Sequence, residues 1–157
     1  VSFQQKMPFF VDKKLYHLHT ISTMTFPQPL ILFDGVCNLC THSVQFVIQR
    51  DAKQQFRFAS IQSDLGQKVL QQYGLSTTKI NTVVLLNNNQ IYTHSTAALH
   101  IAQHLGGLWQ LASLALWIPA PLRDIVYTFV AQNRYRWFGK QESCWLPTPE
   151  LKNRFLS

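Results

Sequence analysis

Two cysteines separated by two residues, Cys37 and Cys40, follow a short apolar run, Leu30–Phe33, and a tight turn at Asp34-Gly35. The residues after the first cysteine have the apolar spacing of a core-facing helix. A thiol at the N-terminus of a helix lies near unpaired backbone N–H groups and the positive end of the helix dipole. Both stabilise a thiolate, the form of cysteine that attacks a disulfide. The pattern therefore predicts a dithiol that exchanges with disulfides.

The two sulfurs are expected to have different roles. The leading cysteine of such a motif lies nearest the free N–H groups, so we expect Cys37 to be the more exposed thiol and the nucleophile. Cys40, one helical turn later on the apolar face, is expected to be the buried thiol that resolves the mixed disulfide. The alternative is a pair of ordinary buried cysteines without redox chemistry.

Asp34, three residues before Cys37, allows two interpretations. A buried carboxylate with a raised pKa could take the proton from Cys40 when that thiol attacks, which makes Asp34 a candidate catalytic residue. Alternatively, Asp34 is a turn residue whose side chain bonds the backbone of Gly35 or Val36.

A metal site is a further hypothesis for the cysteines. His42 together with Cys37, Cys40 and Cys144 would make a Cys₃His zinc set. Structural zinc sites usually draw their ligands from two closely spaced pairs, and the second pair is missing here. We therefore expect no metal, and the dithiol chemistry needs no bound cofactor.

The elements that must position the dithiol follow from periodicity and turn residues. After the first strand and the cysteine-bearing helix, the sequence predicts further elements at 56–60 (strand), 65–73 (helix), 82–86 and 91–92 (a hairpin) and 95–105 (a helix capped by Ser95). The hairpin turn is Asn87-Asn88-Asn89, because asparagine tolerates a left-handed backbone.

This order is β-α-β-α-β-β-α, in which the first two strands are parallel and the hairpin is antiparallel. The natural packing is an α/β thioredoxin-like core over 27–107, with a four-stranded mixed sheet and helices on both faces. Residues 108–157 are expected to form a helical extension packed on the core, with helices near 108–117 and 122–131. Residues 1–26 lack periodicity and are predicted to be a poorly ordered extension.

The run Asp34-Gly35-Val36-Cys37-Asn38-Leu39-Cys40 resembles the D-G-x-C-x-x-C signature of the DCC family of predicted thiol-disulfide oxidoreductases. The resemblance continues at 57–60, 92–98 and 134–140 and at Cys144, so it spans roughly 30–157. It implies a thioredoxin-like fold and an enzyme with disulfide-exchange activity of the protein-disulfide reductase type. Cys144, which matches a family position, is either an additional redox thiol or a small core residue.

The chain departs from the wider thioredoxin superfamily at Asn81. Those proteins usually carry a cis-proline just before the third strand, beside the active thiols. A cis bond before a residue other than proline costs about 2.5–4 kcal/mol, so we expect a trans peptide at Asn81. The surface that usually binds substrate backbone is then altered.

Composition limits the class of protein. The net charge is +7 and only three cysteines are present, so this is not a disulfide-stapled secreted scaffold. No secretory signal or membrane span is apparent, which favours the cytoplasm. The expected partners are a disulfide-containing protein or a small thiol substrate and an external thiol electron donor.

Residues 134–140 interleave basic and aromatic side chains. This composition is compatible with a non-enzymatic module that binds an anionic surface, either a membrane or RNA. The alternative, which we favour, is a structural tail that packs Tyr135, Trp137 and Phe138 on the core while the charged groups stay in water. On that basis we expect no nucleic-acid partner.

Overall fold

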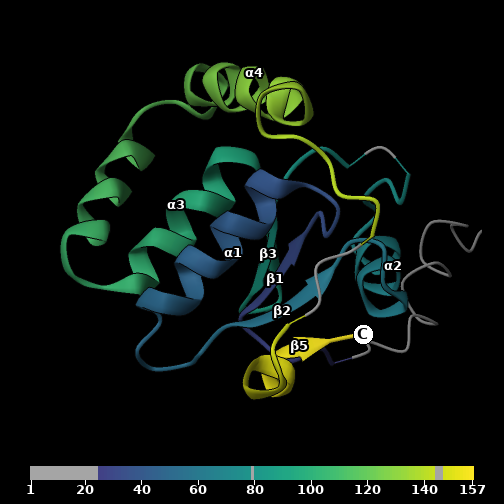
Figure 1. The fold of residues 1–157 in the computed structure, drawn as a ribbon. Helices are drawn as coiled ribbons and strands as arrows, with labels where there is room; N and C mark the ends of the chain where they lie inside the picture. The colour runs from purple at the N-terminus through teal and green to yellow at the C-terminus, as the bar shows by residue number, and fades with distance from the viewer. Residues whose placement is uncertain (1–24, 79, 144–146) are drawn as a thin grey trace, which may run out of the picture.

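The computed structural model describes residues 25–78, 80–143 and 147–157, and Figure 1 shows its elements. In chain order they are β1 (Leu30–Phe33), α1 (Asn38–Arg50), β2 (Arg57–Ser60), α2 (Asp64–Gln72), β3 (Val84–Asn87), β4 (Gln90–Thr93), α3 (His94–Leu105), the 3₁₀-helix η2 (Gly107–Trp117), α4 (Ala120–Phe138), the 3₁₀-helix η3 (Pro149–Arg154) and β5 (Phe155–Leu156). The predicted β-α-β-α-β-β-α order is confirmed.

The strands form one mixed sheet in the order β4-β3-β1-β2-β5. β1 and β2 are parallel, while β3 is antiparallel to both β1 and β4. This α/β arrangement is thioredoxin-like, as expected, but the sheet has five strands instead of four. The extra strand, β5, comes from the predicted helical extension and pairs in parallel with β2. It is only two residues long, which is too short to leave a periodic pattern.

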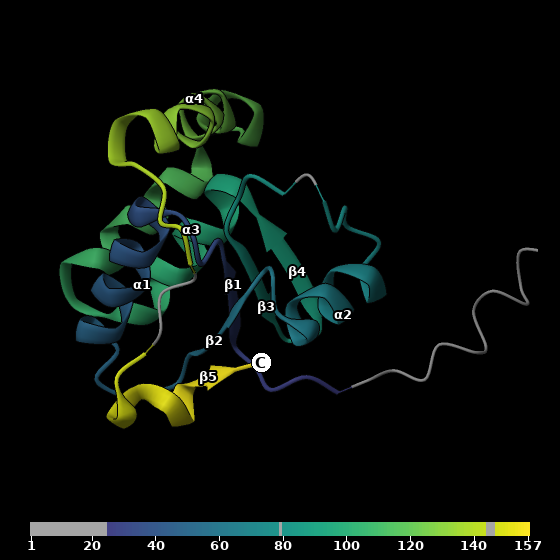
Figure 2. The same cartoon turned by 45° about the vertical axis from the view of Figure 1, so that its right-hand side comes forward.

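Alternation along β1 divides the core between the two faces of the sheet. Leu30 and Leu32 face α2, where they pack with Val69 and Leu70. Ile31 and Phe33 face the opposite side, where the buried residues of α1 and α3 cover them. Figure 2 shows α1 and α3 on one side of the sheet and α2 on the other. The strand that leads to the cysteines is therefore held from both sides.

Two local predictions need correction. Ser95 does not cap α3, because the helix already begins at His94 with Thr93 in the capping position. The Ser95 hydroxyl instead donates a hydrogen bond to Asp124 on α4. The helix expected near 122–131 runs from Ala120 to Phe138, so it includes most of the segment that was predicted to be a tail.

The predicted domain boundaries at 26 and 107 stay predictions. Residues 1–24 of the expected extension, and Cys144, lie outside the described residues. Phe26, at the end of that extension, is buried in the core on the α2 side. Within the described part of the chain the cis peptide bonds are limited to Gln28–Pro29, so the bond that precedes Asn81 is trans, as expected.

Candidate active site

The cysteine pair occupies the predicted junction of strand, turn and helix. β1 ends at Phe33, and the backbone N–H of Cys37 donates to the carbonyl of Asp34 at 3.2 Å, which closes the turn. Cys37 is the N-cap of α1, and its Sγ accepts a hydrogen bond from the backbone N–H of Cys40 at 3.3 Å. A sulfur in this position receives one of the N–H groups that have no partner within the helix.

The expected exposure of the two thiols is reversed. Cys37 is completely buried, with 0% of its surface exposed, whereas Cys40 is half-buried. Both are free thiols in this structure. The prediction that Cys37 is the more exposed sulfur is therefore wrong for this state of the protein, because a distant segment covers it.

That segment comprises residues 138–141, the last residue of α4 and the three residues after it, and we call it the cover segment. Lys140 forms an isolated antiparallel bridge with Cys37, and the N–H of Gln141 donates to the carbonyl of Val36 at 2.8 Å. The side-chain amide of Asn38 donates to the carbonyl of Phe138 at 2.9 Å. These backbone contacts place the cover segment directly against the first cysteine.

Gly139 allows the cover segment to approach α1 closely. Its φ is +82°, in the left-handed region that favours glycine, and an added Cβ would lie 3.1 Å from Nδ2 of Asn38. A larger residue would therefore strain the backbone and also crowd the amide that holds the segment. The position of Gly139 just after α4 also ends that helix.

Asp34 lies at the centre of a buried polar cluster. Its Oδ1 accepts hydrogen bonds from Gln62 at 2.9 Å and from the N–H of Val36 at 3.2 Å. Its Oδ2 accepts from the guanidinium of Arg134 at 2.8 Å and from the hydroxyl of Tyr135. The bond from Val36 is the turn contact predicted as one alternative. The other three partners were not foreseen.

Arg134 is the main functional candidate that the sequence interpretation missed. It was expected to stay in water, yet it is 3% exposed, while Trp137 and Phe138, expected on the core, are about half exposed. The physical reason is the length of α4, which turns Arg134 toward the sheet and the aromatic residues outward. The spacing of Tyr127, Ala131 and Arg134 is that of one helical face, and it was the available sign in the sequence.

The charges around the pair act on Cys40 in opposite directions. Burial raises the pKa of the Cys40 thiol, and the hydrogen bond and charge of Cys37 raise it further. The guanidinium of Arg134 acts against this shift and lowers the pKa, while Asp34 adds a smaller increase. Cys40 is therefore held as a thiol, and the nearby cation reduces the cost of its ionisation.

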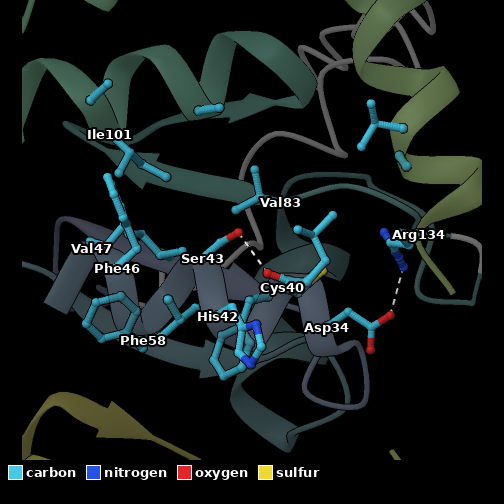
Figure 3. Close-up of a pocket in the computed structure, with 18 of the residues that line it drawn as sticks. Asp34, Cys40, His42, Ser43, Phe46, Val47, Phe58, Val83, Ile101 and Arg134 are labelled. Carbon is cyan, nitrogen blue, oxygen red and sulfur yellow. Dashed lines mark hydrogen bonds and ion pairs between the residues drawn. The ribbon is translucent and has the colours of Figure 1, made fainter. Parts of the chain in front are cut away.

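Cys40 and Arg134 line a cavity of about 490 Å³ between α1, α3 and α4 (Figure 3). Most of its wall is apolar, with contributions such as Phe46, Val47 and Ile101. Among the described residues, no hydrogen-bond partner is present for the buried Nε of Arg134. The cavity therefore places one sulfur of the pair and a buried cation beside an apolar space.

Tyr127 of α4 lines the cavity near the start of β3. Its hydroxyl accepts a hydrogen bond from the N–H of Val83 at 3.1 Å. Burial raises the pKa of Tyr127, and the charge of Cys40 adds to this effect. The backbone N–H of Val83, which lies two residues after Asn81, is therefore bonded by a side chain of α4.

The zinc hypothesis lacks support from the described residues. They contain no group of three or more histidine, cysteine or acidic side chains close enough to hold a metal, so Cys37, Cys40 and His42 do not form such a group. Cys144, the fourth residue of the hypothetical set, lies outside the described residues. His42 instead lines the apolar cavity.

Comparisons with known proteins point to one family. Residues 31–140 match the family model described as DCC1-like thiol-disulfide oxidoreductase. The chain is 48% identical over 130 residues to the uncharacterized protein YuxK of Bacillus subtilis, covering 83% of this chain and 95% of that protein. It is 41% identical over 118 residues to a chloroplastic DCC family protein of Arabidopsis thaliana, covering 74% and 69%. No solved structure matches the chain.

Proposed function

The chain belongs to the DCC1-like thiol-disulfide oxidoreductase family, and from this premise we propose that it reduces disulfides through Cys37 and Cys40. The observation that carries the proposal is the N-cap position of Cys37, whose Sγ accepts the N–H of Cys40. This position directs a backbone N–H at the sulfur that would attack the substrate disulfide. The proposed activity is of the protein-disulfide reductase type, on a protein or small-molecule disulfide.

The exchange proceeds in two steps. The thiolate of Cys37 attacks one sulfur of the substrate disulfide, so that a mixed disulfide forms and the other substrate sulfur leaves as a thiolate. Cys40 then loses its proton and attacks Sγ of Cys37, which releases the second substrate sulfur and forms the Cys37–Cys40 disulfide. Two electrons pass from the protein to the substrate, and an external thiol donor restores the dithiol.

Arg134 supports the second step. Its buried guanidinium lowers the pKa of Cys40, which burial has raised. The cation therefore makes the resolving thiolate accessible where the apolar surroundings would otherwise suppress it. We assign Asp34 a positioning role, because its carboxylate already accepts four hydrogen bonds and holds Arg134 in an ion pair.

The cover segment adds a condition to the first step. Because Cys37 is completely buried under residues 138–141, a disulfide reaches its sulfur only after this segment has moved. We therefore propose that displacement of the cover segment precedes attack. A reducing compartment such as the cytoplasm suits the cycle, since the dithiol must be restored by other thiols.

A comparison of single cysteine variants tests the function. Disulfide reduction by the wild type is measured with dithiothreitol as the electron donor, beside Cys37→Ser, Cys40→Ser and the control Cys144→Ser. We expect Cys37→Ser to fall to the uncatalysed background. Incubated with the disulfide substrate in the absence of dithiothreitol, Cys40→Ser should accumulate a mixed disulfide through Cys37. Cys144→Ser should retain activity. Equal rates for the wild type and Cys37→Ser would refute the proposal.

A further inference from the structure

The bend between η2 and α4 exposes large apolar side chains at the edge of the molecule. Six of them, which we call the apolar corner, are Leu114, Trp117, Ile118, Leu122, Ile125 and Val126. Each is at least 47% exposed, and Trp117 reaches 89%. Single exposed apolar residues are ordinary, but six of them within thirteen consecutive positions on two successive helices point to an interaction surface.

The periodicity of α4 shows that this exposure is not the pattern of a solvated helix. Its inner face lines the cavity with Tyr127, Val130 and Arg134. Its outer face carries Leu122, Ile125 and Val126, all exposed, at positions where a surface helix normally has polar residues. A helix whose inner face is packed and whose outer face is apolar is expected to have a neighbour on both faces.

The shape of the corner suits insertion into a surface more than passage through it. No single helix in the described part of the chain is long and apolar enough to cross a membrane, and only the pair η2 and α4, bent by 119°, meets that criterion together. Figure 1 shows both helices at the outer edge of the molecule, with the connection between them pointing away from the sheet. A shallow insertion leaves both helices attached to the core.

Charge identifies the occupant. The sequence from Leu105 to Leu122 carries no charged residue. At the other end of α4, the exposed Arg136 lies in the last turn and the exposed Lys140 lies two residues after the helix. The acidic residue of α4, Asp124, is engaged inward by Ser95. The chain as a whole is +7, so two copies repel one another, whereas an anionic surface attracts the chain.

We propose that the apolar corner docks on an anionic phospholipid bilayer, with its side chains in the headgroup and upper acyl region and with Arg136 and Lys140 near the lipid headgroups. Tryptophan favours that interfacial depth, and Trp117, the last residue of η2, is the most exposed of the six. The six residues of the apolar corner do not line the cavity of Cys40, and lipid docking does not require disulfide exchange.

Vesicle binding by the full chain tests the proposal. Vesicles of phosphatidylcholine alone and of phosphatidylcholine mixed with phosphatidylglycerol are compared by co-sedimentation and by the blue shift of tryptophan emission. We expect binding to the anionic vesicles, weakened by salt. The triple variant Trp117→Ser, Leu122→Ser, Ile125→Ser should bind about tenfold more weakly or worse, because serine lacks the apolar surface that enters the lipid.

A matched pair of charge variants isolates the local effect. Arg136→Glu with Lys140→Glu should abolish the preference for anionic vesicles. Lys53→Glu with Lys152→Glu makes the same change in net charge at exposed positions outside η2 and α4. This variant should keep most of the preference for anionic vesicles. Circular dichroism confirms that each variant is folded.

Three results would overturn the proposal. The first is wild-type binding no stronger than that of the triple variant. The second is a wild-type protein that forms a dimer in light scattering and does not bind vesicles, while the triple variant is monomeric. The third is binding to single-stranded RNA without vesicle binding.

Discussion

At the scale of single residues, Cys37 and Cys40 lie one helical turn apart but have different surroundings. Cys37 receives a backbone N–H at the helix start, whereas Cys40 faces the apolar cavity. Arg134 is the cation that acts on Cys40 across this space. Its ion pair with Asp34 is almost completely buried, and a buried charge is retained only when it is paired.

The raised pKa of Cys40 predicts how stability depends on pH. The folded reduced protein holds this proton more tightly than the unfolded chain does. Above the ordinary thiol pKa, only the unfolded chain releases it, so the free energy of unfolding should fall with pH. Each unit above about pH 9 should cost up to about 1.4 kcal/mol. Urea denaturation of the reduced protein across pH 8–11 measures this slope.

Two variants separate the contributions to that slope. Cys40→Ser should remove the part that begins near the thiol pKa. Tyr127→Phe should remove only a part at higher pH, because the pKa of Tyr127 is raised from a higher ordinary value. If the slope of Cys40→Ser equals that of the wild type, the raised pKa of Cys40 is not the cause.

At the scale of elements, α4 links the features of the site. It supplies Arg134 and Tyr127 to the cavity, presents the apolar corner and leads directly into the cover segment. The cover segment reaches α1 through one side-chain bond, from Asn38 to the carbonyl of Phe138, and through backbone contacts. A substitution of Asn38 therefore weakens the attachment of the cover segment to α1 without changing the backbone contacts.

Asn38→Ala should make Cys37 react faster with iodoacetamide. The substitution removes an exposed hydrogen bond, worth about 1 kcal/mol, that closes the cover segment. This corresponds to about a fivefold larger open population and the same increase in the alkylation rate. Mass spectrometry of timed samples identifies the labelled cysteine.

Asn133→Ala is the matched control for this experiment. It removes a bond of the same kind, from an asparagine amide to the carbonyl of Phe129, which lies within α4. The rate at Cys37 should be unchanged in this variant. An equal acceleration in both variants would show that general loosening of the protein, and not release of the cover, exposes the thiol.

Local elements could be predicted because their causes are local. The apolar spacing of α1, the asparagine turn between β3 and β4 and the strand before the cysteines each lie within a few residues. The Asp34–Arg134 ion pair joins residues 100 positions apart, and no local pattern records it. The burial of Cys37 has the same origin, since its cover comes from the segment that was predicted to be a tail.

At the scale of the whole molecule, the end of the chain returns to the sheet. β5 adds to the edge beside β2, and the ring of Phe155 stacks on Phe58 with centroids 5.2 Å apart. Arg154 forms a buried ion pair with Asp51, the residue that ends α1. Asp51 also accepts hydrogen bonds from the N–H groups of Gln55 and Phe56, so this pair joins the carboxy-terminal segment to the core.

Arg154→Leu should destabilise the protein by about 3–5 kcal/mol, because it leaves the fully buried carboxylate of Asp51 without its cation. Urea denaturation at neutral pH measures the loss. Lys152→Leu, at an exposed position of the same helix, is the control and should stay within about 0.5 kcal/mol of the wild type. Similar losses in both variants would assign the effect to η3 itself rather than to the ion pair.

The separation between the first cysteine and its cover has a consequence during synthesis. Asn38 and Phe138 are 100 residues apart in the sequence. A ribosome that adds about 5–20 residues per second therefore needs roughly 5–20 s after making the dithiol before the cover segment has been synthesised. During that interval the Cys37 thiol of the nascent chain is not covered by residues 138–141. It is then most open to premature oxidation or to reaction with a neighbouring polypeptide, and this interval ends once the cover segment has been synthesised and has packed against α1.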